Sequence, residues 1–485
     1  METFENVYTG LRKGWFFRTV LLLCLLICVY FALVSAAPLF PVLRLNEHLK
    51  DAALLLEKEG TYYMPFGQMP TMDNFTDAIM LNVTGTLDPR EPIRSGMRMN
   101  ISYIPDDTEL HDSIPELIPI QDFKNFVEGK ATKTWSYARY WHGYVAFLRP
   151  MLSVMAFADV RKLSFFVLMM LFSAAMFLLA RKTDWIVTVS FAVSMILGGF
   201  PILAFCMEYV DSFVIALAVM CVILHWNIRD EERLVRLFLL SGSLTTFIAF
   251  GGLTAPIVTL MFPLLALALP DLEMRLFRWD WRYVKRLILF GIVWSTGYLL
   301  TWGAKWILAD IILGNGLVVL RDATDSILLR SGSGMTFFIR MIPIVTNINA
   351  ILPFSVPITG TGRGPVLLSI AETEGLMPMI KEFVSTLPSS TLLGFAVTTL
   401  VLVVYLIVIV CLAVDSKKRR SIGTLGYFSL AFLFLIPYFW YFVTAGHANH
   451  GFVFRNQIPS LWLFLILPHI MKKKETGDTS LQRSL

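Results

Sequence analysis

Apolar runs of membrane-spanning length recur along the whole of this sequence. A helix that crosses the hydrocarbon core of a bilayer needs roughly 20 mostly apolar residues. Ten windows approach that requirement, at residues 19–37, 164–180, 185–206, 211–226, 236–254, 256–269, 287–312, 391–414, 424–443 and 457–470. The sequence therefore predicts an all-α polytopic membrane protein with about ten transmembrane helices.

The composition agrees with a membrane protein and argues against other classes. Hydrophobic residues make up 56% of the chain and charged residues only 16%, against roughly 25% charged residues in ordinary soluble domains. The formal net charge of +5 is small for 485 residues and lies in short basic clusters, which argues against a nucleic-acid partner. All five cysteines lie inside apolar runs, so the polar segments have no thiol with which to form a disulfide.

The basic clusters predict how the chain crosses the membrane. They precede the first window and follow the second, fourth, sixth, eighth and tenth: Arg12, Lys13 and Arg18; Arg181 and Lys182; Arg229, Arg233 and Arg236; Arg275, Arg278, Arg282, Lys285 and Arg286; residues 417–420; and residues 472–474. In a ten-helix arrangement all these clusters share one side, which the positive-inside rule makes cytoplasmic. We therefore expect a plasma-membrane protein with both termini in the cytoplasm.

This topology divides the chain into segments that alternate between membrane and water. They are the cytoplasmic N-terminus and first helix (1–37), a large extracytoplasmic loop with juxtamembrane helices (38–163), helices two to seven (164–312), an outer or re-entrant segment (313–390), the last three helices (391–470) and a cytoplasmic tail (471–485). A further span hidden in 313–390, where prolines interrupt an apolar run, would reverse the sidedness of everything after it.

The first outer loop carries a pair of acidic residues that could perform chemistry. Asp73 and Asp77 lie four residues apart in the segment 71–77 (TMDNFTD), a spacing that places both carboxylates on one face of a helix. There they could share a cation, a hydroxyl or a metal ion. The alternative is that Asp73 only caps the start of a helix. The pair would allow Mg²⁺ or Mn²⁺ to bind, but nothing in the sequence requires a metal or another cofactor.

A cationic and aromatic cluster follows in residues 137–144 (YARYWHGY). Aromatic rings beside arginine are typical of the interface between lipid headgroups and water. At this interface Arg139, His142 and Tyr144 could hold a phosphate or a sugar hydroxyl. The alternative is a simple aromatic belt with an arginine that extends to the water.

Lys305 is predicted to emerge at the outer end of the seventh span. It lies about 28 Å along a helix from the cytoplasmic Arg286, at a rise of ~1.5 Å per residue. An ammonium group at that height could bind the phosphate of a lipid carrier. The alternative is an interfacial anchor that pairs with Asp310.

The last outer connection, residues 446–457, is short and rich in polar side chains. It contains His447, His450 and Arg455 within about ten residues between two predicted helices, a density that an ordinary loop does not need. We therefore favour a substrate-binding function for this connection, with Arg455 as the group that binds phosphate or pyrophosphate.

The order of these features resembles the GT-C superfamily of lipid-dependent glycosyltransferases. The resemblance covers nearly the whole chain: one span, a large acidic first outer loop with membrane-hugging helices, many further spans and a smaller late outer segment. The segments 73–77 (DNFTD), 302–306 (WGAKW) and 449–452 (NHGF) agree with it. It implies that a first-loop carboxylate is the general base and that cations bind the phosphate of a polyprenyl-phosphate sugar. In this assignment Asp73 is the base and Asp77 the second choice.

The same resemblance implies the partners of the protein. They are membrane lipids, a polyprenyl-phosphate-linked sugar donor, and a glycan or cell-envelope polymer as the acceptor. A lipid-linked donor also suits an outer catalytic loop, because soluble nucleotide-activated sugars do not reach that side. The sequence departs from the family in one respect: the family carboxylate often lies soon after the first span, where this chain has Glu47 and Asp51.

Two other functions fit part of the pattern. A polysaccharide polymerase or ligase also joins lipid-linked glycans outside the cell, but its large outer loop tends to come late in the chain. A transporter or lipid flippase usually shows internal repeats and ionisable groups at the bilayer midplane, and the predicted spans contain few such groups. The donor sugar and the acceptor stay open, because sugar recognition depends on the shape of the pocket.

Overall fold

The computed structural model describes residues 13–40, 44–63, 72–104, 118–248, 254–273, 281–351, 424–448 and 453–472, with isolated positions at 377–378, 381–382, 407, 410, 411 and 414. The described chain is mostly helical. It divides into two compact units. The first unit comprises Met1–Ala175, Gly199–Pro263 and Leu289–Ser333, and the second comprises Met176–Gly198, Leu264–Ile288 and Gly334–Leu485.

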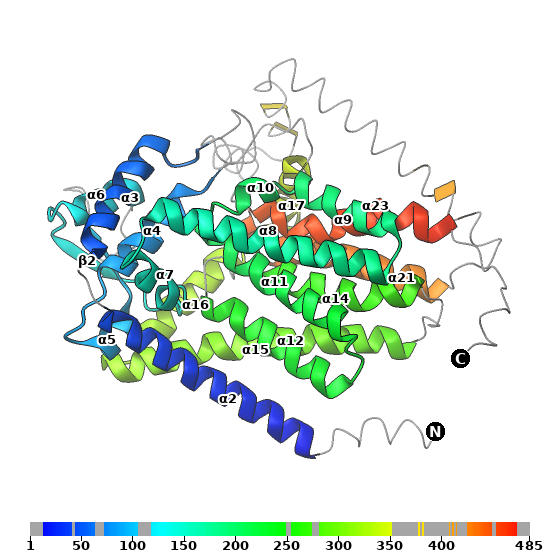
Figure 1. Ribbon diagram of the computed structural model, residues 1–485, viewed down its shortest axis with the longest axis horizontal. Helices are drawn as coiled ribbons and strands as arrows, with labels where there is room; N and C mark the ends of the chain where they lie inside the picture. The colour runs from blue at the N-terminus through cyan, green and yellow to red at the C-terminus, as the bar shows by residue number, and fades with distance from the viewer. Residues whose placement is uncertain are drawn as a thin grey trace. The chain divides into compact units, whose positions relative to one another are not determined.

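Four helices in the described residues are long and apolar enough to cross a membrane. They are α2 (Lys13–Ala36), which continues into the turn η1 (Ala37–Leu39), α8 (Phe157–Lys182), α11 (Met207–Trp226) and α15 (Trp281–Leu313) (Figure 1). These helices indicate a multi-pass membrane protein. The prediction of ten transmembrane helices is wrong in number, because the described chain has four such helices and not ten.

The other predicted spans fall on helices that are shorter or more polar. The window 185–206 is split into α9 (Trp185–Leu197) and α10 (Phe200–Leu203), because Gly199 adopts a φ of 77° that interrupts the helix. The helix α12 (Glu231–Ile248) carries four charged residues in its first two turns. The window 391–414 lies outside the described residues apart from four isolated positions.

The three remaining windows fall on three other helices. They are α14 (Pro256–Glu273), α21 (Thr424–Val443) and α23 (Ile458–Lys472), with 18, 20 and 15 residues. Of these, α23 is clearly shorter than the roughly 20 residues that a perpendicular crossing needs.

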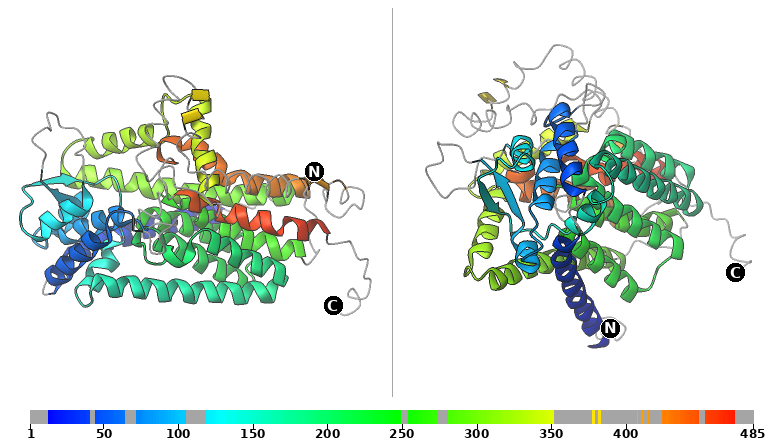
Figure 2. Two further views of the ribbon diagram at one scale, coloured as in Figure 1. Left: turned by 90° about the horizontal axis from the view of Figure 1, so that it is seen from above. Right: turned by 60° about the vertical axis from the view of Figure 1, so that its left-hand side comes forward.

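The described residues between α2 and α8, within 37–156, form a small domain that we call the loop domain. Its elements are α3 (Leu45–Glu59), α4 (Asn74–Gly85), α5 (Pro92–Arg98), β1 (Asn100–Tyr103), α6 (Pro119–Val127), β2 (Lys133–Ser136) and α7 (Val145–Leu152). The two strands pair antiparallel, with Asn100 opposite Ser136 and Tyr103 opposite Lys133. Figure 2 shows α3, α6 and this sheet packed together.

The sequence of α3 explains how the loop domain begins. Its buried residues Leu45, Leu49, Ala52 and Leu56 recur at helical spacing and form one apolar stripe. The helix ends before Gly60, whose φ of 79° is a backbone conformation that glycine adopts readily and other residues rarely do. The stripe contributes to the core of the domain.

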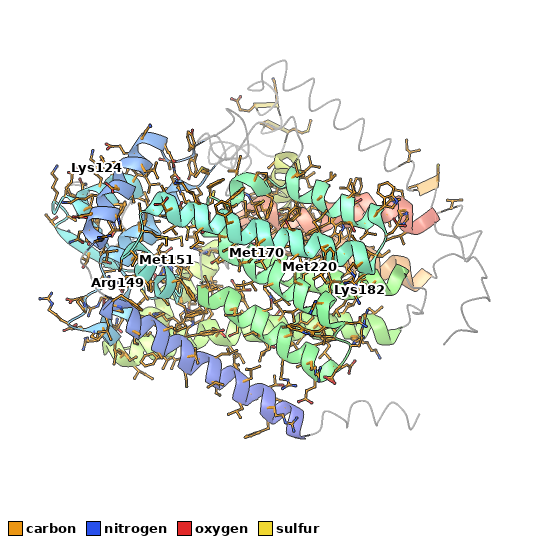
Figure 3. All side chains as sticks on the ribbon, in the orientation of Figure 1. Lys124, Arg149, Met151, Met170, Lys182 and Met220 are labelled. Atoms are coloured by element: carbon orange, nitrogen blue, oxygen red, sulfur yellow. The ribbon has the colours of Figure 1, made fainter. Side chains whose placement is uncertain are left out.

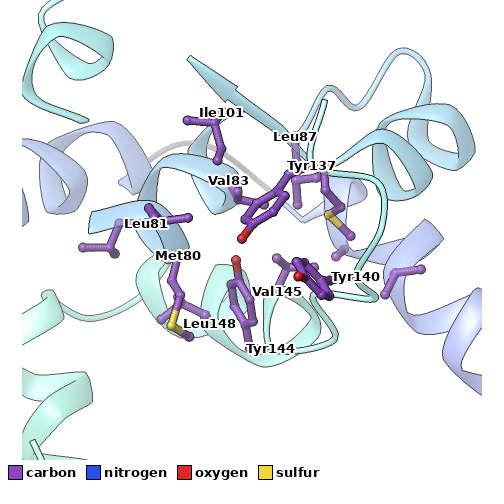
Figure 4. Close-up of a cluster of buried hydrophobic side chains, with 14 of the residues drawn as sticks. Met80, Leu81, Val83, Leu87, Ile101, Tyr137, Tyr140, Tyr144, Val145 and Leu148 are labelled. Carbon is purple, nitrogen blue, oxygen red and sulfur yellow. The ribbon is translucent and has the colours of Figure 1, made fainter. Parts of the chain in front are cut away.

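The core continues around α4 and α7 with aliphatic and tyrosine side chains. Met80 and Val83 of α4 and Leu148 of α7 are buried in the same cluster as Tyr137 and Tyr144. Figure 4 shows the hydroxyl groups of the two tyrosines directed toward each other inside this cluster. The predicted aromatic segment is therefore part of the domain core.

Five helices of the first unit present one end to the loop domain. The helix α2 contacts it at Val34, whose carbonyl packs against Gly96. The helices α8 and α11 contact it through Arg161 and the Met207 N–H, which both bind Asp77. The helix α12 contacts it at Phe247, whose carbonyl accepts from Gly143 N–H at 2.8 Å. The fifth contact joins α15 to the domain, since Trp306 Nε1 donates to Arg139 O at 2.9 Å. The loop domain therefore covers the ends of these helices.

The helix α16 (Val318–Arg330) follows α15 in the first unit. The carboxylate of Asp310 accepts hydrogen bonds from Val319 N (2.8 Å) and Leu320 N (3.1 Å) and so satisfies the first N–H groups of α16. This interaction joins the last turn of α15 to the start of the next helix.

The second unit contains α9, α17 (Phe337–Ala350), α21, α22 (Ala445–Ala448), η2 (Val453–Gln457) and α23. Trp462 of α23 packs on Phe191 of α9, with ring centroids 4.7 Å apart, and donates to Val187 O at 3.0 Å. The helix α17, which contains Pro343, occupies the start of the apolar run that the sequence predicts to be re-entrant.

Within the first unit, α12 and α15 pack through glycines at backbone distance. A Cβ atom on Gly297 would lie 2.4 Å from Leu239 O, and one on Gly242 would lie 2.0 Å from Trp294 O. The close approach brings Ser243 Oγ within 2.7 Å of Thr301 Oγ1. Small residues at such crossings let membrane helices pack tightly and form hydrogen bonds across the interface.

Replacement of Gly297 by alanine is expected to destabilise the first unit. The new methyl group would meet backbone atoms of α12, which cannot rotate away as a side chain can, at a cost of about 1–3 kcal/mol. Gly303→Ala on the same helix is the matched control, because nothing lies within 4 Å of a Cβ there. Thermal unfolding of the purified variants measures both effects, and equal melting temperatures would contradict this packing.

Candidate functional site

The two predicted carboxylates lie at the start of α4. Asp73 is the N-cap of this helix: its Oδ1 accepts from Thr76 N (3.2 Å) and its Oδ2 accepts from Thr76 Oγ1 (2.7 Å). Asp77 lies in the first turn of the same helix. Asp73 therefore caps the helix, which is the alternative that the sequence left open, and both acids are buried.

Arg161, from the first turns of α8, binds two carboxylates and one side-chain amide of the loop domain. Its guanidinium donates to Asp77 Oδ2 (2.8 Å), to Asn74 Oδ1 (2.7 Å) and to Glu59 Oε2 at the end of α3 (2.8 Å). Asn74 Nδ2 in turn donates to the same Glu59 oxygen at 3.0 Å. Two helices of the loop domain, α3 and α4, and the long apolar helix α8 therefore meet at one arginine.

Asp77 also joins the loop domain to a second long apolar helix. Its Oδ1 accepts from Met207 N at 3.1 Å, and so satisfies one of the unpaired N–H groups at the start of α11. Its side chain has no exposed surface. Burial raises the pKa of Asp77 from 3.8 to about 6, and the charge of Arg161 opposes that rise.

This shift predicts how stability depends on pH. The folded carboxyl of Asp77 keeps its proton up to about pH 6, whereas the unfolded carboxyl loses it near 3.8. Because the folded state binds more protons in this range, the contribution of Asp77 to stability is lost as the pH rises from about 4 to about 6. Thermal unfolding across this range should show that decline, and Asp77→Asn should flatten it. An equal slope in the variant would contradict the assignment.

A third buried carboxylate lies near the pair. Glu208 is in the first turn of α11, directly after Met207, and is 1% exposed. Both Asp73 and Glu208 act electrostatically on Tyr62, whose pKa rises to about 12 mainly through burial. Tyr62 is therefore flanked by two acids from distant parts of the sequence.

Sequence reasoning missed Glu59, Arg161 and Glu208 as members of this site. The available signal was modest: Arg161 is a positive charge on the predicted outer side of a span, where basic residues are disfavoured. Glu47 and Asp51, the acids nearest the first span, are exposed on α3. The structure thus separates them from the buried acid cluster.

Arg139 lies in a box of aromatic rings. Its guanidinium carbon is 5.3, 4.7 and 5.2 Å from the ring centroids of Trp135, Tyr137 and Tyr140, distances at which cation–π attraction operates. It also donates to both carboxylate oxygens of Asp322 on α16, at 2.9 and 3.1 Å. The predicted phosphate-binding arginine thus has a carboxylate partner.

His142 and Tyr144 are buried beside this box. His142 Nε2 lies 3.0 Å from Tyr137 O and its Nδ1 lies 3.3 Å from Tyr144 Oη, so both ring nitrogens have partners inside the protein. Burial lowers the pKa of His142 to about 3. The imidazole is therefore neutral at physiological pH and supplies hydrogen bonds rather than positive charge.

Lys305 is buried against the loop domain. Its Nζ donates to Met97 O (2.9 Å) and Gly96 O (3.4 Å) and lies 5.7 Å from the ring centroid of Trp141. The predicted alternative partner, Asp310, instead caps α16. The ammonium group therefore binds backbone carbonyls and an aromatic ring rather than that carboxylate.

The predicted residues of the last connection belong to the second unit. His447 and Arg455 are buried there, and Arg455 lies 5.0 Å from the ring centroid of Phe454. Asn347 of α17 donates to Ala448 O at 2.8 Å, and Tyr441 of α21 donates to Val453 O at 2.9 Å. His450 lies outside the described residues.

Among the residues that the structure describes, no group of three or more His, Cys, Asp or Glu side chains is arranged to hold a metal ion. Comparison of the chain with protein-family models, curated proteins and solved structures finds no match.

Proposed function

We propose that this chain is an integral membrane glycosyltransferase of the GT-C type. It moves a sugar from a polyprenyl-phosphate donor to an extracytoplasmic glycan or cell-envelope polymer. The proposal places the loop domain outside the plasma membrane and both termini in the cytoplasm.

One observation carries the proposal: Asp77, a buried carboxylate of α4, lies against the ends of two long apolar helices. Asp77 contacts both α8 and α11, and Asp73 lies one helical turn away on α4. An acidic group at the junction between a polar domain and the membrane is well placed for a reaction between a lipid-linked donor and a water-soluble acceptor. Acids with raised pKa values are also enriched at functional sites.

The proposed reaction is a direct displacement at the anomeric carbon. The acceptor hydroxyl oxygen forms the new glycosidic bond as the carbon–oxygen bond to phosphate breaks, and polyprenyl phosphate leaves with the electron pair. The carboxylate of Asp73 takes the hydroxyl proton, with Asp77 as the second candidate. An ionised carboxylate has about four lone-pair sites, so Asp73 can cap α4 through two of them and still accept a proton.

The departing phosphate needs positive charge, which stabilises the transition state. In the proposal Arg139 and Lys305, both of the first unit, supply it. Lys305 suits this role, since its contacts in the described chain are carbonyls, a thioether and a ring, none of which cancels its charge.

Lipids that copurify with the protein test this function. Mass spectrometry of the extracted lipids is expected to find a polyprenyl-phosphate monosaccharide enriched over total membrane lipid. A carrier pyrophosphate with a long glycan would instead favour a polymerase or ligase. If no sugar-bearing carrier is enriched and none stimulates transfer in vesicles, the glycosyltransferase proposal is wrong.

A further inference from the structure

Arg139 differs from the other buried arginines of the first unit in the exposure of its acidic partner. Its own side chain is 8% exposed, whereas that of Asp322, which accepts from it at 2.9 Å, is 32% exposed. Arg161 is paired with Asp77, whose side chain has no exposed surface. Arg149 on the short helix α7 (Figure 3) donates to backbone oxygens at 2.8 and 3.4 Å. The carboxylate of Asp322 thus remains partly in water while its guanidinium partner is buried.

A second guanidinium lies beside the same aromatic box. The guanidinium carbon of Arg330, at the end of α16, is 5.4 Å from the ring centroid of Tyr140, and that of Arg139 is 5.2 Å from the same centroid. Within the described part of the chain, the buried Nη1 atom of Arg330 has no hydrogen-bond partner. A buried donor is costly to leave unsatisfied, and protein structures usually supply a water, an ion or a ligand for it.

Asp322 and Arg330 share one face of α16. Asp322, Ser326 and Arg330 follow one another at intervals of four residues, which places them along one side of the helix. Ser326 Oγ lies 3.4 Å from Tyr140 Oη, so this face meets the aromatic box at each of the three positions. Two of the 13 residues of α16 are buried. The attachment of α16 to the loop domain therefore depends largely on polar contacts.

The charges of this group leave one positive charge without balance. Arg139 and Arg330 carry two positive charges against the one carboxylate of Asp322, and the buried imidazole of His142 is neutral. A phosphodiester, the form of phosphate in a polyprenyl-phosphate sugar, carries one negative charge. Guanidinium groups bind carboxylate and phosphate oxygens with the same hydrogen-bonding geometry. A phosphate can therefore replace Asp322 on Arg139.

We propose that Asp322 is an internal competitor of the substrate. Its carboxylate holds Arg139 until the phosphate of the lipid-linked donor displaces it, and Arg330 of the same helix then binds that phosphate together with Arg139. Asp322 is the partner that leaves, because its partly exposed carboxylate returns to water at low cost, whereas the buried guanidinium needs an anion. The identity of the donor rests on the proposed function, but the assignments of Asp322 and Arg330 go beyond it.

Binding of undecaprenyl phosphate tests the competition without requiring sugar transfer. The purified protein is titrated with this lipid, and native mass spectrometry measures the dissociation constant. Asp322→Asn is expected to lower the dissociation constant several-fold, because a competing arrangement no longer reduces the fraction of protein that can bind. Damage to the fold would raise the constant, so the direction of the change separates competition from a structural role. The matched control is Asp325→Asn, an exposed acid of the same helix, which should leave the constant unchanged.

Arg330→Gln tests the second arm of the site in the same titration. It is expected to raise the dissociation constant about tenfold or more, since the variant loses a charge-assisted hydrogen bond to phosphate. Arg321→Gln removes an exposed cation of the same helix and should have no effect. Equal constants for Arg330→Gln and Arg321→Gln would remove Arg330 from the site.

A parallel titration with inorganic phosphate separates the possible failures. If undecaprenyl phosphate binds but Asp322→Asn does not bind it more tightly, the competition is wrong and the transferase proposal is unaffected. If Asp322→Asn tightens the binding of inorganic phosphate alone, the site takes free phosphate and not a lipid-linked donor. If the unsubstituted protein binds neither compound, the competition and the donor assigned in the proposed function are both wrong.

Discussion

Asp73→Asn is expected to lower the rate of sugar transfer by about 10²–10⁴-fold, the usual contribution of a general base. The amide cannot take the acceptor proton, but asparagine caps a helix about as well as aspartate. The hydrogen bond from Thr76 N to Asp73 Oδ1 can therefore persist in the variant. Transfer from a polyprenyl-phosphate sugar in proteoliposomes measures the loss, and donor binding should be unchanged.

The control for this variant is Asp88→Asn, an acid of the same domain that pairs with the exposed Arg90 at 2.8 Å. It should transfer sugar at the unsubstituted rate. If Asp73→Asn retains full transfer while Asp77→Asn loses it, the base is Asp77. If both asparagine variants retain full transfer, neither carboxylate is the base.

Arg161→Met is expected to destabilise the loop domain by about 3–5 kcal/mol, the range seen when one partner of a buried ion pair is removed. Methionine fills much of the same space but leaves Asp77 and Glu59 without their cation. The effect should be smaller at low pH, where the acids accept protons. Thermal unfolding and limited proteolysis of the loop domain measure it.

Two controls separate loss of the pair from loss of a surface charge. Lys162→Met, one residue further along α8, removes a pair in which both side chains are more than half exposed and should cost about 0–1 kcal/mol. The double variant Arg161→Met with Asp77→Asn removes both buried charges and should be more stable than Arg161→Met alone. A double variant that is still less stable would show that Asp77 does not need a cation.

The membrane character of the fold could be predicted from the sequence. Long apolar windows follow directly from residue order, and four of them correspond to long apolar helices. The number of spans could not be predicted in the same way, because a window average does not register local breaks. Gly199 divides one window into two short helices, and the charges of α12 dilute another.

The candidate site could be predicted only where its members are neighbours in sequence. The spacing of Asp73 and Asp77 placed them together, and one helical turn is enough to explain why. Arg161 is 84 positions from Asp77, and Met207 is 130 positions away. No local pattern reports such distances, so both partners were missed.

The sequence by itself determined that this chain enters a membrane and that its first long polar segment carries an acidic pair and an aromatic cluster, because hydropathy and helical spacing depend only on residue order. The tertiary structure alone decided which charges are partnered: Asp77 with Arg161, Arg139 with Asp322, and Lys305 with backbone carbonyls. The physical reason is desolvation. The cost of burying a charge, and the partner that offsets it, depend on groups that only the folded chain brings within hydrogen-bonding distance.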